Sequence, residues 1–355
     1  MMTAQEVAHR VVTQGAAPLA AAGWARGGTG GRRAREAGGA TEVLFDLASV
    51  TKPMTAVAIA WAGIDRGTPL GALVEEARGT PSEAVPLELL LAHRAGLDAH
   101  RTLYAPLIEG RPVDVSAALK EAASARRPDS AGGPPPGGFA PLYSDLGYLL
   151  AGVALARAVG ARDAGEAISR LVLEPLGLAD TAGTVRELEA RGVRLPFAPT
   201  ETVEWRGGPV VGAVHDENAW AVSGKGGSGH AGIFGTVDAV LTFGLSVLDR
   251  IHEAELQWLI HERPGGSLRA GFDGKSPEGS SAGTLMGPRS FGHLGFTGTS
   301  LWVDPDARIV VSLLSNRVSP TRAHLAIRAA RPEAHDALFA RGSSWPSLAS
   351  HGGER

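Results

Sequence analysis

Apolar positions along the chain recur at two spacings, which predict a mixture of helices and strands. Helical spacing, with apolar residues three or four positions apart, occurs at 3–13, 53–66, 87–93, 113–125, 145–158, 163–173, 236–250, 253–261 and 321–340. Runs of apolar or β-branched residues bounded by turn residues predict strands at 17–25, 43–45, 290–296, 300–303 and 309–315. The glycine-rich stretches 195–235 and 264–288 show no periodicity and predict no regular element. The stretch 32–42 is polar, and the arginines at 26, 32, 33 and 35 are interpreted as a solvated hairpin.

The order of these elements predicts an α+β fold. Strands lie near both ends of the chain and helices lie between them, so the terminal strands are expected to share one sheet that carries a largely helical insertion. We therefore expect a single domain over residues 1–345, with a sheet region at about 1–50 and 285–345 and a helical region at about 51–284. The last residues, 346–355, are expected to be a frayed tail.

Composition narrows the classes of function. The chain has no cysteine, which excludes disulfides, thiolate metal sites and a cysteine nucleophile. A net charge of -3 gives no general attraction to nucleic acid or to anionic lipid. No apolar run reaches the roughly 18–20 residues of a membrane span, and no convincing signal peptide precedes the first helix, so a cytoplasmic protein is expected. The histidines lack the spacing of metal ligands, so neither a metal nor another cofactor is expected.

Ser49 and Lys52 lie three residues apart in the segment LASVTKPMT. Pro53 is tolerated only in the first turn of a helix, so Ser49 must lie at or beside a helix N-terminus. At this spacing the lysine amine can reach the serine hydroxyl, and the helix end can stabilise an oxyanion. The pair predicts an acyl-enzyme nucleophile if burial lowers the pKa of Lys52 towards neutrality. The alternative is an N-cap serine beside a solvated lysine.

The segment FDLASVTKPMTA resembles the nucleophile segment of the serine β-lactamase and penicillin-binding protein superfamily, particularly its class C and esterase branch. Two further segments follow in the family's order: YSD at 143–145 matches the tyrosine motif Y-x-N, and HLG at 293–295 takes the place of K-T-G. The resemblance runs from about residue 15 to 335. It implies the β-lactamase/transpeptidase-like fold, a mostly antiparallel five-stranded sheet flanked by helices and joined to a helical subdomain.

The resemblance also implies roles for individual residues. Ser49 would attack the substrate carbonyl, and Lys52 and Tyr143 would shuttle the proton. The backbone N–H groups of Ser49 and of Phe296, which follows Gly295, would hold the oxyanion. His293 would orient the substrate or assist protonation. No cofactor is implied, and the expected substrate is a small ester, amide or peptide.

Departures from the family's motifs bear on the substrate. A histidine and a leucine replace the lysine and threonine that help hold a substrate carboxylate, so β-lactams become less favoured. Asp145 replaces the usual asparagine; it would either favour the charged form of Lys52 or cap its own helix. These changes favour a hydrolase of small esters or amides. The alternatives are a D-amino-acid peptidase or weak β-lactamase, or a non-catalytic binding protein that keeps the fold.

Several other signals have structural interpretations. His230, in GSGHAGIF, is either a structural loop residue or part of the cleft, where it would bind substrate. Arg322, Arg328 and Arg331 are interpreted as the solvated face of the last helix. Ser281 matches G-x-S-x-G but lacks the flanking strand and helix of a nucleophile elbow, so it is interpreted as a chance match.

Overall fold

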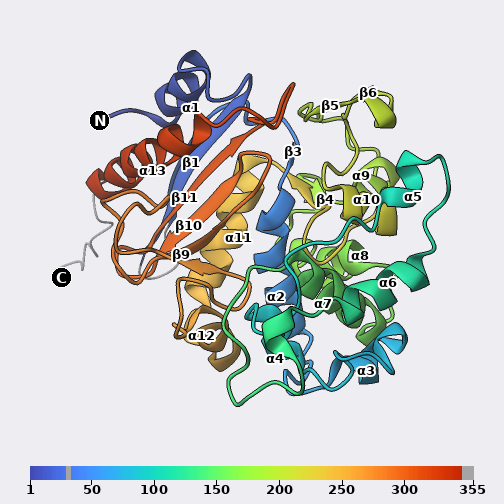
Figure 1. The fold of residues 1–355 in the computed structure, drawn as a ribbon. Helices are drawn as coiled ribbons and strands as arrows, with labels where there is room; N and C mark the ends of the chain where they lie inside the picture. Colours follow the sequence, from blue (N-terminus) through green and yellow to red (C-terminus); the bar gives the residue numbers. More distant parts are fainter. Residues whose placement is uncertain (29–32, 346–355) are drawn as a thin grey trace.

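The computed structural model describes residues 1–28 and 33–345 and shows a mixed α+β fold built on one large antiparallel sheet (Figure 1). Six strands form this sheet in the order β2-β1-β11-β10-β9-β8. Their bounds are Ala20–Gly27 for β1, Arg33–Gly39 for β2, Asp273–Gly274 for β8, Phe291–Leu294 for β9, Ser300–Asp304 for β10 and Ile309–Ser315 for β11. The prediction for the tail, 346–355, lies outside the described residues.

The expectation of α+β class is confirmed, but the expectation of five strands is wrong by one. The extra edge strand, β8, is two residues long and lies within a glycine-rich stretch, where so short a segment leaves no pattern. The polar stretch 32–42, interpreted as part of a solvated hairpin, contains β2, which pairs antiparallel with β1 at the opposite edge. The residues of β2 are mostly exposed or half-buried. Charged residues on an edge strand are common because they discourage pairing with another chain.

Helices cover both faces of the sheet (Figure 1). Helices α1 (Ala4–Thr13) and α13 (Ile327–Ser344) cover one face, and α11 (Val237–Asp249) covers the other. Alternate residues of β1 enter different cores: Ala22 and Trp24 pack with α1 and α13, whereas Ala21 and Ala25 pack with α11. Because both faces are buried, the central strands carry apolar residues on both faces and are mostly apolar, although Ser312 interrupts the apolar run of β11.

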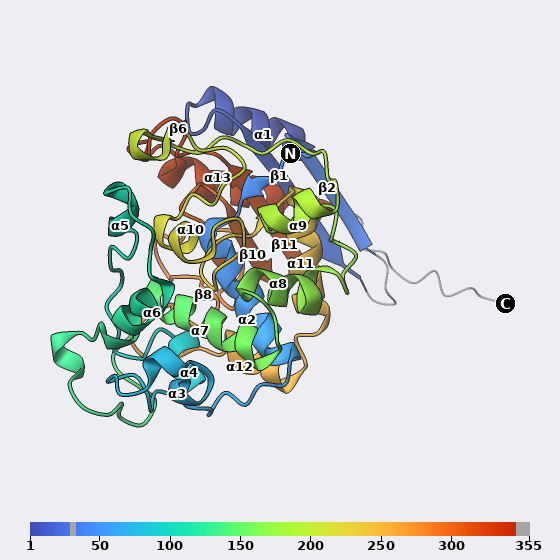
Figure 2. The same ribbon diagram turned by 90° about the vertical axis from the view of Figure 1, so that its right-hand side faces the viewer.

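The remaining helices gather on the side of α11 away from the sheet (Figure 2). They are α2 (Thr51–Trp61), α3 (Leu70–Leu73), α4 (Leu87–Leu91), α5 (Ala105–Ile108), α6 (Val115–Ser124), α7 (Asp145–Ala158), α8 (Ala164–Ile168), α9 (Val185–Ala190), α10 (Glu217–Ser223) and α12 (Ala254–Ile260). Two small sheets complete the fold. One has three strands, β3 (Phe45–Asp46), β7 (Phe234–Gly235) and β4 (Ala182–Gly183), and the other has two, β5 (Thr202–Val203) and β6 (Gly208–Pro209). Within the described ranges, no helix is both long and apolar enough to cross a membrane.

Helix α2 begins at the junction of the two regions. Its first nine residues are all buried, which agrees with the nearly apolar sequence that predicted it. A short 3-10 helix, Ala48–Val50, leads into it, so Pro53 falls in the first turn as expected. Ser49 consequently lies between β3 and α2, at the boundary of the sheet region and the helical region.

Candidate functional site

A tight turn before α2 presents Ser49 to a cavity. Ala48 adopts φ 47°, in the left-handed region that non-glycine residues rarely enter. Its N–H donates to Asp46 Oδ1 at 2.8 Å, and the N–H of His215 donates to Asp46 Oδ2 at 2.7 Å. Burial raises the pKa of Asp46 to about 6, against the lowering effect of these two hydrogen bonds. The carboxylate thus fixes the strained turn that positions Ser49.

Lys52 connects Ser49 to the helical region. Its side chain is 0% exposed, and its Nζ lies 2.8 Å from Ser49 Oγ and 2.6 Å from Asp145 Oδ1. The expected contact between Ser49 and Lys52 along one helix face is therefore present. Asp145 is 93 residues further along the chain, at the start of α7.

The expected lowering of the Lys52 pKa is wrong. Burial by itself lowers it, but the charge of Asp145, together with Tyr143, more than offsets burial and raises the pKa above its ordinary value. Lys52 is consequently an ammonium at neutral pH. Of the two alternatives for Asp145, the helix cap is excluded, because Ser144 caps α7 by accepting from the Gly147 N–H at 3.2 Å. The Asp145 carboxylate is left to pair with Lys52.

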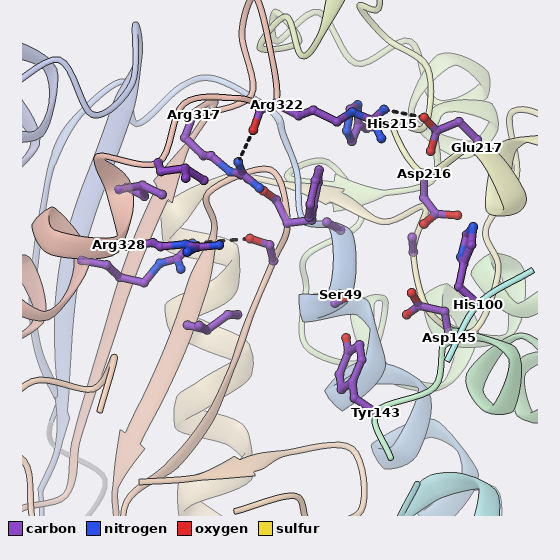
Figure 3. A pocket seen from close by; sticks show the side chains of 18 of the residues that line it. Ser49, His100, Tyr143, Asp145, His215, Asp216, Glu217, Arg317, Arg322 and Arg328 are labelled. Carbon is purple, nitrogen blue, oxygen red and sulfur yellow. Dashed lines mark hydrogen bonds and ion pairs between the residues drawn. The ribbon is translucent and has the colours of Figure 1, made fainter. Parts of the chain in front are cut away.

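Tyr143 lies against the same ammonium group. Its ring centroid is 4.6 Å from Lys52 Nζ, and Figure 3 shows its hydroxyl end pointing toward Ser49. Burial raises the pKa of Tyr143, although the charge of Lys52 opposes this shift, so the phenol is neutral at pH 7. His93 stacks on the Tyr143 ring at 4.8 Å, and its Nδ1 accepts from the Ser144 N–H at 3.0 Å. His93 therefore fixes Tyr143 through its stacked ring and through the backbone N–H of the next residue, Ser144.

His293 lies on the other side of Tyr143, with 5.9 Å between the ring centroids. It is buried, and its Nδ1 lies 2.8 Å from the Leu294 carbonyl oxygen. Burial, with the nearby charge of Lys52, lowers the pKa of His293 to about 3. The imidazole is therefore neutral and donates its Nδ1–H to that carbonyl. The position that holds lysine in K-T-G relatives carries no positive charge here.

The turn between β9 and β10 is fastened to the turn that carries Ser49. Thr297 Oγ1 donates to the Asp46 carbonyl at 2.7 Å, and Thr299 Oγ1 donates to the Leu47 carbonyl at 2.9 Å. A Cβ at Gly295 would lie 2.0 Å from Thr299 Oγ1, so this approach requires glycine. Among the hydrogen bonds of the described residues, the N–H groups of Ser49 and Phe296 have no intramolecular acceptor. Both remain available to a ligand.

A cavity of about 440 Å³ opens over Ser49, within the range of small-molecule sites. Tyr143, Asp145, Gly295 and Phe296 line it, whereas His293 is not among its lining residues. Sequence reasoning did not assign a role to the other polar lining residues, which are His100, Tyr104, His215, Asp216, Glu217 and Arg317. Most of them come from loops without periodicity.

His230 lies behind this cavity. It is 1% exposed, and its Nε2 is 2.9 Å from Asp216 Oδ1, while its Nδ1 is 3.0 Å from Ser228 Oγ. Burial raises the pKa of Asp216, but the charge and hydrogen bond of His230 outweigh burial and hold that pKa below its ordinary range. His230 thus reaches the cavity through Asp216.

The interpretation of three arginines as a solvated helix face is wrong for Arg331, which is buried. Arg328 is exposed on α13, and Arg322 is exposed but precedes that helix. Arg322, Arg328 and Arg331 all line the cavity, and Arg331 is only 8% exposed. The spacing of these arginines could not predict this, because a charged helix face has the same sequence pattern whether it is exposed to solvent or lines a cleft. The packing of α13 against the sheet brings Arg328 and Arg331 to the cavity, and the segment before α13 brings Arg322.

Comparisons with known proteins agree with this architecture. The family model described as Beta-lactamase matches residues 5–335. Curated relatives include putative D-alanyl-D-alanine carboxypeptidases from Salmonella gallinarum, 27% identical over 215 residues, and from Escherichia coli K12, 26% identical over 203 residues. Each match covers 50% of this chain and 45% of the relative. The chain therefore spans about half the length of the curated relatives it matches.

Solved structures of similar fold cover nearly the whole chain. A beta-lactamase from Mycobacterium bovis has a TM-score of 0.59 at 23% identity, covering 95% of this chain and 99% of that one. EstCE1, a hydrolase with promiscuous acyltransferase activity, has a TM-score of 0.63 at 19% identity, covering 92% and 97%. A class C beta-lactamase mutant has a TM-score of 0.63 at 15% identity, covering 94% and 96%. These likenesses establish a shared fold.

Proposed function

Since the chain belongs to the beta-lactamase family and has that family's serine-hydrolase fold, we propose that it hydrolyses a small ester or amide through an acyl-enzyme on Ser49. The observation that carries the proposal is the contact between Ser49 Oγ and Lys52 Nζ at 2.8 Å, with Tyr143 against the same ammonium and a cavity above. A candidate nucleophile, a candidate proton carrier and a cavity that can hold a substrate therefore lie together.

Acylation in this proposal starts from the form in which Lys52 has lost its proton. Ser49 Oγ bonds to the substrate carbonyl carbon while its proton moves to Lys52 Nζ. The carbonyl oxygen becomes an oxyanion, which accepts hydrogen bonds from the N–H groups of Ser49 and Phe296. The bond to the leaving group then breaks, and the leaving group takes the proton from Lys52 through Tyr143. Water attacks the acyl-enzyme by the reverse proton path and releases the acid.

Two histidines are assigned supporting roles. His293 is neutral and buried against Tyr143, so we assign it to positioning that phenol. His230 orients Asp216, a carboxylate that lines the substrate space. The absence of a cation at position 293 supports an ester or small amide over a β-lactam.

A D-amino-acid peptidase activity is the second candidate, favoured by the curated relatives described as putative carboxypeptidases. Comparing kcat/KM for short acyl esters, a D-alanyl dipeptide and nitrocefin distinguishes the two. Faster turnover of the dipeptide or nitrocefin than of the esters would favour the second candidate. A non-catalytic binding protein would turn over none of them, and the retained contacts of Ser49, Lys52 and Tyr143 argue against it.

The nucleophile is tested with a fluorophosphonate probe followed by mass spectrometry of the intact protein. We expect one adduct on the wild-type protein and none on Ser49→Ala. Ser281→Ala is the matched control, because Ser281 lies in the chance G-x-S-x-G match and should label like wild type. Labelling that persists in Ser49→Ala would overturn the proposal.

A further inference from the structure

One side of the cavity is strongly basic. Arg317 follows β11, and Arg322, Arg328 and Arg331 come from the segment that leads into α13 and from its first turns. Figure 3 shows Arg317 and Arg328 on one side of Ser49, with Asp145 and Asp216 on the other side. The carboxylates on the acidic side already have partners within the protein: Asp145 lies 2.6 Å from Lys52 Nζ, and Asp216 lies 2.9 Å from His230 Nε2.

The basic side is compensated only in part. Arg322 pairs with Glu201 and Glu217. In the described part of the chain, no carboxylate lies within ion-pair distance of Arg317, Arg328 or Arg331, which we call the arginine cluster. Arg317 donates to backbone carbonyls only, those of Phe296, Arg322 and His324. Three positive charges therefore border the cavity without a protein counter-charge.

Arg331 is the member whose exposure to water is smallest. It is 8% exposed, its Nε has no hydrogen-bond partner, and its terminal nitrogen reaches the Gly295 and Thr299 carbonyls only at 3.4 and 3.5 Å. Burial, with the charge of Arg317, lowers the pKa of Arg331 to about 10, so it remains charged at neutral pH. A buried, unpaired cation is costly. An anion in the cavity would offset that cost.

We propose that the arginine cluster binds a dianionic phosphoryl or phosphonyl group of the substrate while the scissile carbonyl lies over Ser49. This inference rests on the proposed function and adds the substrate class to it. A single carboxylate would balance one of the three charges. A compact dianion with three oxygens can accept from several guanidinium groups at once, which suits three converging arginines.

Two matched ester series test the preference. On the acyl side, the para-nitrophenyl esters of pentanoate, glutarate and phosphonobutyrate carry none, one and two negative charges at similar length. On the leaving-group side, phenyl acetate is compared with its para-carboxy and para-phosphoryloxy derivatives. We expect kcat/KM in at least one series to be about 10-fold or more higher for the dianion than for the monoanion. Equal values in both series, or a preference for the monoanion, would overturn the proposal.

Substitutions test whether the arginine cluster causes the preference for the dianionic ester. In Arg328→Gln we expect the ratio of kcat/KM for the dianionic ester to that for the neutral ester to fall about 10- to 100-fold. Arg289→Gln, at an exposed arginine paired with Asp306 outside the cavity, is the control and should keep the wild-type ratio. An unchanged ratio in Arg328→Gln would contradict the assignment. The neutral ester still reports Ser49 chemistry, so failure here is distinguishable from failure of the proposed function.

A binding measurement gives a readout independent of turnover. At constant ionic strength, inorganic phosphate should raise the melting temperature of Ser49→Ala, because a ligand that binds only the folded protein stabilises it. Adding Arg328→Gln or Arg331→Gln should reduce that increase. If Arg331→Gln fails to fold, Arg328→Gln alone decides the result. No increase with phosphate, or an equal increase in the double variant, would overturn the proposal.

Discussion

Lys52 is the residue whose protonation the rest of the site controls. Burial of an amine favours its neutral form, and a carboxylate at hydrogen-bond distance favours its charged form. Here the carboxylate of Asp145 lies 2.6 Å from Lys52 Nζ, and the net effect is a raised pKa. A site built this way keeps the lysine charged at rest, so the proposed acylation would depend on the small neutral fraction of Lys52.

Asp145→Asn tests this balance at the residue scale. The amide keeps the shape of Asp145 and removes its charge, so the pKa of Lys52 should fall. Because the neutral amine is the reactive form, the acidic limb of kcat/KM should shift to lower pH, and activity at pH 7 should rise. Asp129→Asn, at a carboxylate that is 68% exposed, should leave the profile unchanged. A limb that stays in place in Asp145→Asn, or shifts to higher pH, would contradict the role given to Lys52.

At the scale of elements, the site depends on two turns that are fastened to each other. The turn between β9 and β10 donates the hydroxyls of Thr297 and Thr299 to the segment just before Ser49. Strand β3, which lies just before Ser49, pairs with β7. These contacts set the separation of the Ser49 and Phe296 N–H groups, which in the proposed mechanism donate to one oxyanion.

Thr299→Val removes the hydrogen bond between the two turns while keeping the shape of the side chain. The buried Leu47 carbonyl loses its hydroxyl donor, which should lower the free energy of unfolding by about 1–2 kcal/mol. Looser spacing of the two N–H groups should lower kcat about 10-fold or more, with a smaller change in KM. Thr242→Val is the control: its hydroxyl bonds to the Asp238 carbonyl within α11, so it should affect stability alone. Unchanged kcat in Thr299→Val would exclude a positioning role.

At the scale of the whole molecule, one hydrophobic core crosses the boundary between the sheet region and the helical region. It contains Ala21 of β1, Val57 of α2, Leu150 of α7, Leu241 of α11 and Val310 of β11. The cavity and Ser49 lie at this boundary, so the two regions must stay together for the site to exist. A shared core of this kind favours one cooperative unit.

We therefore expect a single unfolding transition in urea. Four of the seven tryptophans lie in the helical region, at positions 61, 205, 220 and 258, so they are replaced by phenylalanine. Fluorescence of this variant then reports on the sheet region through the buried Trp24 and Trp302, whereas far-ultraviolet circular dichroism reports mainly on the helices. The two curves should coincide. Separate midpoints would show that the sheet region and the helical region are distinct domains.

Acid should destabilise the whole molecule. Burial lowers the pKa of His293 to about 3 and of His335 to about 4, against 6.5 for an unhindered histidine. The stability they contribute is present above pH 6.5 and is lost as the pH falls towards these values. Asp46, with its raised pKa of about 6, opposes the loss in part. Burial also holds the pKa of His93 well below its ordinary value, so His93 adds to the loss, and the free energy of unfolding should fall between pH 6.5 and pH 4.

Urea titrations at a series of pH values measure this loss. His335→Gln should reduce the dependence on pH, because one buried neutral imidazole is removed. His9→Gln, at an exposed position, should leave the dependence as in wild type. A stability that is constant between pH 6.5 and pH 4 would contradict the assignment of these histidines as buried and neutral.

Local chemistry determined those features that the sequence alone could predict. Pro53 fixed the start of α2, and a spacing of three residues placed Lys52 against Ser49, because both effects act within one helical turn. The helix at 145–158 and the strands 300–303 and 309–315 followed from periodicity for the same reason. Each of these depends on neighbours a few residues away.

Tertiary structure alone decided the features that depend on distant residues. The charge on Lys52 is set by Asp145, which a local pattern allowed either to cap its helix or to reach across the cleft. Arg331 became part of the cavity only when α13 packed on the sheet, and β8 formed only because β9 offered it an edge. Burial and ion pairing depend on which distant parts of the chain pack together, and the spacing of residues along the chain does not predict these tertiary contacts.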